Sequence, residues 1–302
     1  MRRMRAYLLI ALALAAGGPT ASGCQRHAVA PEPVTAAPVL DLPPAPAGAA
    51  PAAPPEKGEE TAALQFCGET LSRAHQRVRC NDSAITDLSV LRSLGGLRTL
   101  DLTNTGALDL GPLADLSELE TLSVSATPVT DLSPLASLAR LRSLDASETG
   151  VSDLAPLAGL VRLRELYLSS THASDLAPLV RLRELKWLDL SGTPVADPTA
   201  LASLPSVSHL NLAKTAVVDV SSLAQMRSLG WLVLAGTKVT DVRPIAALPY
   251  LAVLDLTGSA VVDISPLGAL DSLQTLHVKE TRVTSAQLAA LKRRRPGLAI
   301  AH

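Results

Sequence analysis

A repeat of 22 residues constrains the fold of this chain more than any other feature. One hydrophobic residue per unit recurs at that spacing without an insertion, at Leu97, Leu119, Leu141, Leu163, Leu185, Val207, Leu229, Leu251 and Leu273. Each unit reads L-x-x-L-x-L, then Thr, then Asp-Leu-x-Pro-Leu-x-x-Leu, with small variations. A unit this short cannot bury its hydrophobic side alone, so the repeat predicts stacked coils that share one continuous core.

The two halves of the unit predict different local structures. The L-x-L alternation predicts a short strand with one buried face. A segment such as Asp131–Leu135, which contains Pro134, is too short and too rich in proline for a long helix and predicts a tight turn.

From Val78 to about Val283 this pattern resembles the leucine-rich-repeat family, in the short form found in internalins. The resemblance implies an α/β fold. Its architecture would be a right-handed solenoid, with parallel strands on the concave side and short 3₁₀ turns on the convex side.

Composition agrees with a repeat protein that binds and does not catalyse. Hydrophobic residues make up 47% of the chain but aromatic residues only 2%, so the core must be built from Leu, Val and Ala. The net charge of −1 gives no field that would favour nucleic acid. The sequence has no glycine-rich phosphate loop, no metal-ligand spacing and no nucleophile elbow. We therefore expect no enzyme activity, no cofactor and no metal site.

Two polar ladders follow the repeat and are interpreted as structural. The first is Asp87, Asp109, Asp131, Asp153, Asp175, Asp197, Asp219, Asp241 and Asp263. Stacked carboxylates could hold calcium, but each Asp precedes a predicted turn, where its oxygen can accept a backbone hydrogen bond, and capping is favoured. The second is Thr105, Thr127, Thr149, Thr171, Thr193, Thr215 and Thr237. These hydroxyls are expected to satisfy backbone groups where each strand ends.

The N-terminus is typical of an export signal. Three arginines within the first five residues precede the apolar segment 6–16, which is too short for the roughly 20 residues that span a bilayer. The sequence Ala21-Ser22-Gly23-Cys24 resembles the lipobox of bacterial lipoproteins, which implies cleavage before Cys24 and its lipidation. An ordinary secretory signal is the alternative. We expect a lipid-anchored protein of the cell envelope; because Gln25 is not Asp, the outer membrane is favoured if the host has one.

The expected organisation has five parts. Residues 1–23 form the signal peptide, 24–60 a Pro/Ala-rich disordered tether, 61–77 an N-terminal cap, 78–284 the repeats and 285–302 a C-terminal cap with a helix over Ser285–Arg294. If Cys24 is lipidated, Cys67 and Cys80 remain as a pair in an oxidising compartment. A disulfide that staples the N-terminal cap is favoured, and two buried free thiols are the alternative.

The outward strand positions offer a candidate binding surface. In early repeats they are small and polar, but the middle repeats also place aromatic side chains there, and the candidate site residues are Tyr167, Trp187, Asp189, His209, Asn211 and Trp231. At about 4.8 Å per strand, the two tryptophans should lie about 10 Å apart with His209 between them. Aromatic residues on a polar wall are typical of interface anchors, and the two polar residues would add contacts. We predict a monomeric recognition module that binds a protein or glycan on the concave face; the alternative is a structural or adhesive envelope protein without a discrete ligand.

Overall fold

The computed structural model describes residues 64–81 and 84–302. Its main sheet has 11 strands in the order β13 to β3, and every neighbouring pair is parallel. The strands are β3 (Arg77–Arg79), β4 (Thr99–Asp101), β5 (Thr121–Ser123), β6 (Ser143–Asp145), β7 (Glu165–Tyr167), β8 (Trp187–Asp189), β9 (His209–Asn211), β10 (Trp231–Val233), β11 (Val253–Asp255), β12 (Thr275–His277) and β13 (Ala299–Ala301). The predicted signal peptide and tether, with Cys24, lie outside the described residues.

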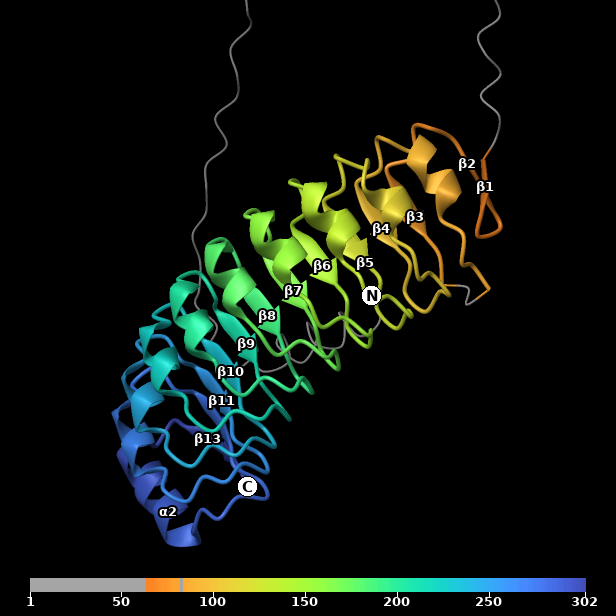
Figure 1. Cartoon of the computed structure of the whole chain (residues 1–302). Coiled ribbons are helices and arrows are strands. Elements are labelled where there is room, and N and C mark those ends of the chain that lie inside the picture. The colour runs from red at the N-terminus through yellow and green to blue at the C-terminus, as the bar shows by residue number, and fades with distance from the viewer. Residues whose placement is uncertain (1–63, 82–83) are drawn as a thin grey trace, which may run out of the picture. The chain divides into compact units, whose positions relative to one another are not determined.

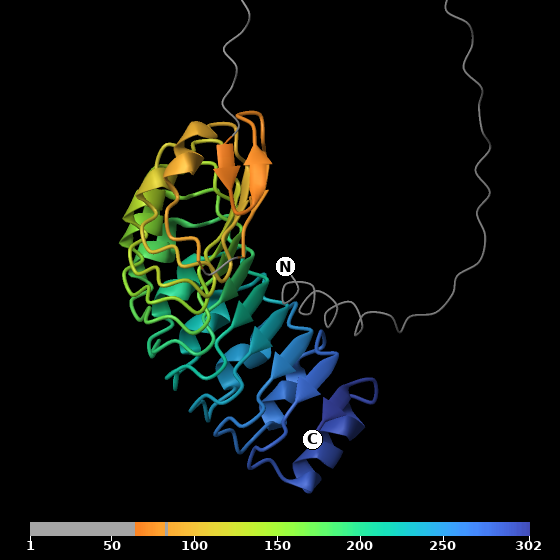
Figure 2. The ribbon, with the colours of Figure 1, turned by 90° about the vertical axis from the view of Figure 1, so that its right-hand side faces the viewer.

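One short 3₁₀ turn follows each strand from β3 to β11. The turns are η1 (Ser89–Ser93), η2 (Gly111–Leu113), η3 (Ser133–Ser137), η4 (Ala155–Gly159), η5 (Ala177–Arg181), η6 (Thr199–Ser203), η7 (Ser221–Gln225), η8 (Arg243–Ala247) and η9 (Ser265–Ala269). Figure 1 shows the turns along the outer side of the curved stack of coils, and Figure 2 shows the strands side by side on the other face. This arrangement confirms the predicted fold class.

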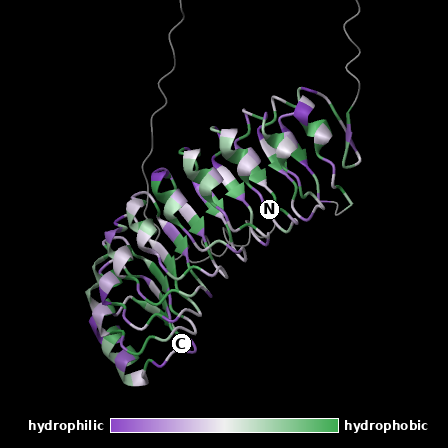
Figure 3. Ribbon diagram, in the orientation of Figure 1, coloured by the Kyte–Doolittle hydropathy of each residue, from purple (hydrophilic) through white to green (hydrophobic). Residues whose placement is uncertain are grey.

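The core lies between the strands and the turns. The middle residue of each strand points inward, as Leu100, Leu144 and Leu188 do at 0% exposure. Each turn adds at least one buried side chain from the other side, such as Leu135 or Leu179. Figure 3 shows the hydrophobic segments recurring from coil to coil. A core of branched aliphatic residues stacked in register explains why the sequence needs so few aromatic residues.

All nine residues of the aspartate ladder bond to the turn that follows. In each repeat one carboxylate oxygen accepts a hydrogen bond from the backbone N–H two residues later, at 2.7–2.9 Å. The capping interpretation is confirmed, although the Asp stands one residue before the position that caps the turn, as Asp131 does before Leu132. Among the described residues, no group of three or more His, Cys, Asp or Glu side chains could hold a metal ion.

The threonine ladder is confirmed as well. Each hydroxyl donates to the backbone carbonyl three residues earlier, for example from Thr105 to Leu102 at 2.8 Å and from Thr171 to Leu168 at 2.8 Å. In the next repeat after Thr237, a serine replaces the threonine, and the buried Oγ of Ser259 has no hydrogen-bond partner among the described residues. The threonine ladder therefore satisfies backbone acceptors at the strand ends.

The residue before each ladder threonine has a left-handed backbone, a feature that the repeat pattern did not predict. Six residues at this place in the coil are not glycine: Asn104, Ala126, Glu148, Ser170, Lys214 and Glu280, with φ between 56° and 62°. The conformation lets the backbone N–H reach the next coil, as Ala126 N donates to Ser147 O at 2.9 Å. Because a side chain in this region costs about 1–2 kcal/mol, the coil-to-coil bonds must offset it. The residue types at this place differ too much between repeats for the sequence to reveal the left-handed backbone.

Both ends of the stack are closed by elements that differ from the repeat. At the start, the antiparallel hairpin β1 (Leu64–Phe66) and β2 (Glu69–Leu71) buries Phe66 and Leu71. At the other end lies α2 (Ser285–Arg294), with the predicted bounds. Thr284 caps the helix, because its Oγ1 accepts from Gln287 N at 3.3 Å while Oε1 of Gln287 accepts from Thr284 N at 2.9 Å. Nε2 of Gln287 also donates to Val262 O of an earlier repeat at 3.0 Å.

Candidate functional site

The outward positions of each strand form two rows that run across the sheet. Strand register pairs the first residue of each strand with the first of the next, so Glu165, Trp187, His209 and Trp231 follow one another in one row. The third residues form the second row, where Tyr167 lies between Asp145 and Asp189. Parallel pairing in register therefore brings together side chains that are 22 residues apart in sequence.

Four aromatic rings meet at the centre of these rows, and we call Tyr167, Trp187, His209 and Trp231 the aromatic cluster. The ring of His209 stacks on Trp187 with centroids 4.2 Å apart and planes 9° from parallel. Trp231 lies 5.5 Å from Trp187 and 5.8 Å from His209, and Tyr167 lies 6.4 Å from Trp187. All four side chains are partly exposed, so neither tryptophan belongs to the leucine core.

The two tryptophan rings are closer together than strand spacing predicted. Spacing alone separates residues two strands apart by about 10 Å, yet the ring centroids of Trp187 and Trp231 are 5.5 Å apart. Long side chains lean toward one another, because contact between rings removes apolar area from water and offset or tilted pairs are favourable. The result is one continuous aromatic surface and not two separate anchors.

Burial and charge shift the pKa of two members of the cluster. Burial raises the pKa of the Tyr167 hydroxyl, and the carboxylates of Glu165, Asp145 and Asp189 raise it further. Burial lowers the pKa of His209, which favours the uncharged form of this ring. The Oγ of Ser208 lies 2.9 Å from Nδ1 of His209, which fixes the ring that stacks on Trp187.

Asp189 and Asn211 lie beside the rings but are buried, at 7% and 8% exposure. Oδ1 of Asp189 accepts from Ser191 N at 2.9 Å, and Oδ1 of Asn211 accepts from Ala213 N at 3.0 Å. Asp145 makes the same strand-end bond, to Ser147 N. Burial raises the pKa of Asp189. Both side chains thus support the ends of their strands, and their contact with a ligand stays a prediction.

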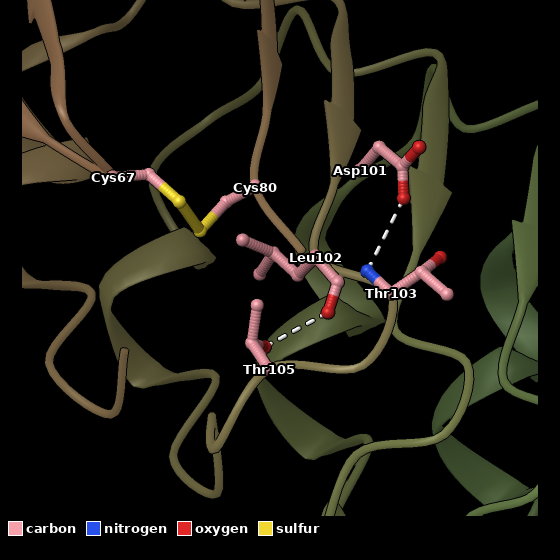
Figure 4. Close-up of a disulfide and its surroundings, with 6 residues drawn as sticks. All are labelled: Cys67, Cys80, Asp101, Leu102, Thr103 and Thr105. Atoms are coloured by element: carbon pink, nitrogen blue, oxygen red, sulfur yellow. Dashed lines mark hydrogen bonds between the residues drawn. A yellow bond between two sulfur atoms is a disulfide. The ribbon is translucent and has the colours of Figure 1, made fainter. Parts of the chain in front are cut away.

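The cysteine pair lies far from the cluster, at the start of the stack. Cys67 and Cys80 are joined by a disulfide with a Cα–Cα distance of 5.7 Å, and Cys80 is 1% exposed. Figure 4 shows the bond connecting the hairpin to the first coil, beside Leu102. This linkage ties the N-terminal cap to the repeats.

Comparison with known proteins gives likeness in structure only. No family model matches the sequence, and no curated protein matches it either. The solved structures include an internalin C2 from Listeria monocytogenes, which is 29% identical with a TM-score of 0.60 over 63% of this chain and 86% of that one. The fold is a leucine-rich-repeat solenoid.

Two further leucine-rich-repeat structures are similar at lower identity. One, from Leptospira interrogans, is 20% identical with a TM-score of 0.68 over 74% of this chain and 58% of its own. The other is the plant peptide hormone receptor RGFR1 in complex with RGF2, 15% identical with a TM-score of 0.63 over 76% of this chain and 39% of its own. Within the part of this solenoid that the structure describes, no helix is long and apolar enough to cross a membrane.

Proposed function

We propose that this protein is a recognition module that binds a protein ligand on the concave strand face of its solenoid. The observation that carries the proposal is the aromatic cluster, four contacting and partly exposed rings on a sheet face whose other outward positions are mostly small or polar. Large aromatic side chains at the centre of a surface are the residues that dominate binding energy in protein interfaces. The plant receptor of the same fold, solved with RGF2, supports a protein ligand over a glycan.

The proposal is non-catalytic and needs no cofactor. The aspartate and threonine ladders are used by the backbone, and the rings offer contact area and not a nucleophile. Binding through such a surface should depend on few residues, because the surrounding contacts mainly exclude water.

A random dodecapeptide library, selected on the full chain, tests the proposal. Trp187→Ala and Trp231→Ala should each weaken the binding of the selected peptides by about 2 kcal/mol, which raises their Kd roughly 30-fold. Thr99→Ala, at the equivalent place in β4, is the matched control and should change Kd less than twofold. Peptides that bind all three variants equally would refute the assignment of the site and favour a structural or adhesive role.

We further propose that Cys24 anchors the mature protein to a membrane of the cell envelope, the outer membrane if the host has one. The support is the resemblance of Ala21–Cys24 to a lipobox. The wild type should partition into the detergent phase, and Cys24→Ala should leave it for the aqueous phase. Equal partitioning of both proteins would refute lipid anchoring without affecting the proposed binding face.

A further inference from the structure

The strands around the aromatic cluster carry carboxylates but no Lys or Arg. Strands β4 to β11 contain Asp101, Asp145, Glu165, Asp189 and Asp255, and neither of the two basic residue types. Arg79 of β3 pairs with Asp101 at 3.4 Å, so that charge is neutralised at the first end of the sheet. The other four carboxylates lie on β6, β7, β8 and β11, on or next to the strands that carry the rings.

None of these four carboxylates forms an ion pair with another described residue. Oδ1 of Asp145 and Oδ1 of Asp255 accept backbone hydrogen bonds at 3.0 and 2.8 Å, and Oε2 of Glu165 accepts from Ser143 Oγ at 3.0 Å. Each of these three side chains has a second oxygen outside those bonds, and all three are partly exposed. Negative charge therefore faces solvent beside the rings.

The field of these carboxylates converges on the cluster. Tyr167 lies between Asp145 and Asp189 in the second row and follows Glu165 by two residues on its own strand. The same three carboxylates raise the pKa of its hydroxyl, since a phenolate there would be repelled. A group of positive charge at this place would be attracted for the same reason.

Several basic residues stand at the edge of the sheet where the strands begin. Arg142, Arg164 and Lys186 each precede a strand by one residue. Arg142 lies 3.7 Å from Glu120 and Arg164 lies 3.2 Å from Glu184. Both arginines are thus paired with glutamates outside the strands, and among the described residues none of the three basic ones forms an ion pair with a carboxylate of the row that contains Asp145 and Tyr167.

We propose that the aromatic cluster takes a basic segment of the partner protein, with an Arg or Lys side chain against the rings of Trp187 and Trp231. This inference rests on the proposed function and names the chemistry of its ligand. A cation over an indole face is attracted by the ring, and the planar guanidinium of Arg also stacks on it. Asp145, Glu165 and Asp255 would then meet the charge of the segment and favour it over neutral or acidic partners.

Three synthetic peptides test the charge requirement. They share a capped twelve-residue Gly-Ser sequence in which three positions are all arginine, all citrulline or all glutamate. Binding can be followed by intrinsic tryptophan fluorescence, because the chain has two Trp and both lie in the cluster. The arginine peptide should bind at least tenfold more tightly than the citrulline peptide, which has the same shape without charge, and the glutamate peptide should not bind.

Neutral variants of the carboxylates give the matched test. Asp145→Asn combined with Glu165→Gln should raise the Kd of the arginine peptide about tenfold. The Asn should keep the strand-end bond, as Asn211 does at 3.0 Å in an equivalent position. Asp153→Asn removes one charge beside a turn, outside the strand rows, and should leave the Kd unchanged.

The outcomes separate this inference from the proposed function. Citrulline and arginine peptides of equal affinity, an arginine peptide that does not bind, or an equal loss with Asp153→Asn would overturn it. Tryptophan-dependent library peptides without basic residues would also overturn it, while the proposed binding face would stand. Library peptides that bind the Trp187→Ala and Trp231→Ala variants as tightly as the wild type would overturn the proposed binding face itself.

Discussion

Adjacent residues of one strand lie on opposite faces of the sheet in this solenoid, one on the outward surface and the next in the core. The Trp187 side chain lies on the sheet face and stacks on His209, whereas Leu188 is 0% exposed in the core. Alternation along a strand enforces this separation, because successive side chains point to opposite faces. Binding and stability can therefore be changed independently at neighbouring positions.

Substitutions at these two positions should show the separation. Leu188→Ala leaves a cavity among stacked leucines and should cost about 2–5 kcal/mol of unfolding free energy. Trp187→Ala loses ring contacts on a surface open to water and should cost about 1 kcal/mol. Urea denaturation followed by far-UV circular dichroism measures both. A larger loss for Trp187→Ala would mean that the aromatic cluster stabilises the fold and was wrongly assigned as a binding surface.

Among the elements, the 3₁₀ turns η1 to η9 depend on charge as well as on packing. Proline within the first two residues of most turns presets the backbone, and the preceding Asp accepts the first free N–H. In some repeats the residue two positions after the Asp also has a side-chain donor. That side chain donates a hydrogen bond to the same carboxylate, as Ser89 Oγ does to Asp87 at 3.0 Å. These hydrogen bonds lower the pKa of six ladder residues, namely Asp87, Asp131, Asp197, Asp219, Asp241 and Asp263.

The lowered pKa values predict an acid-sensitive solenoid. A carboxyl group with a pKa below its ordinary value of 3.8 stabilises the fold above that pH, and this stabilisation is lost as pH falls through the lowered pKa. The urea midpoint should therefore fall below about pH 4. A variant with Asn at the six positions keeps an acceptor but does not titrate, so its midpoint should fall less. Identical pH profiles for the two proteins would contradict this account.

For the solenoid as a whole, stability depends on contacts between coils that are 22 residues apart. Each strand bonds to the next in parallel register, and the left-handed residues extend those bonds beyond the strand ends. A coil at either end has only one neighbour, so an unrelated element closes it: the hairpin with its disulfide at the start, and α2 at the other end. The aromatic cluster lies in the middle of the row, where coils have neighbours on both sides.

Local patterns in the sequence were enough to predict the coil. The inward leucines, the aspartate and threonine bonds and the bounds of α2 each need only residues a few places apart, and the period needs only the comparison of one unit with the next. The two outward rows could be predicted from the same period. The residues of the aromatic cluster were therefore identifiable from sequence alone, although their proximity was underestimated.

How those residues meet depends on tertiary packing. The rings of Trp187 and Trp231 converge because side chains from successive coils lean together. The left-handed position at Ala126 and its equivalents shows no constant residue type, because a backbone bond to the next coil holds it. The negative surface around Tyr167 likewise arises from carboxylates on three strands. These features depend on distances between residues about 22 apart in sequence, which stacking sets and local pattern does not.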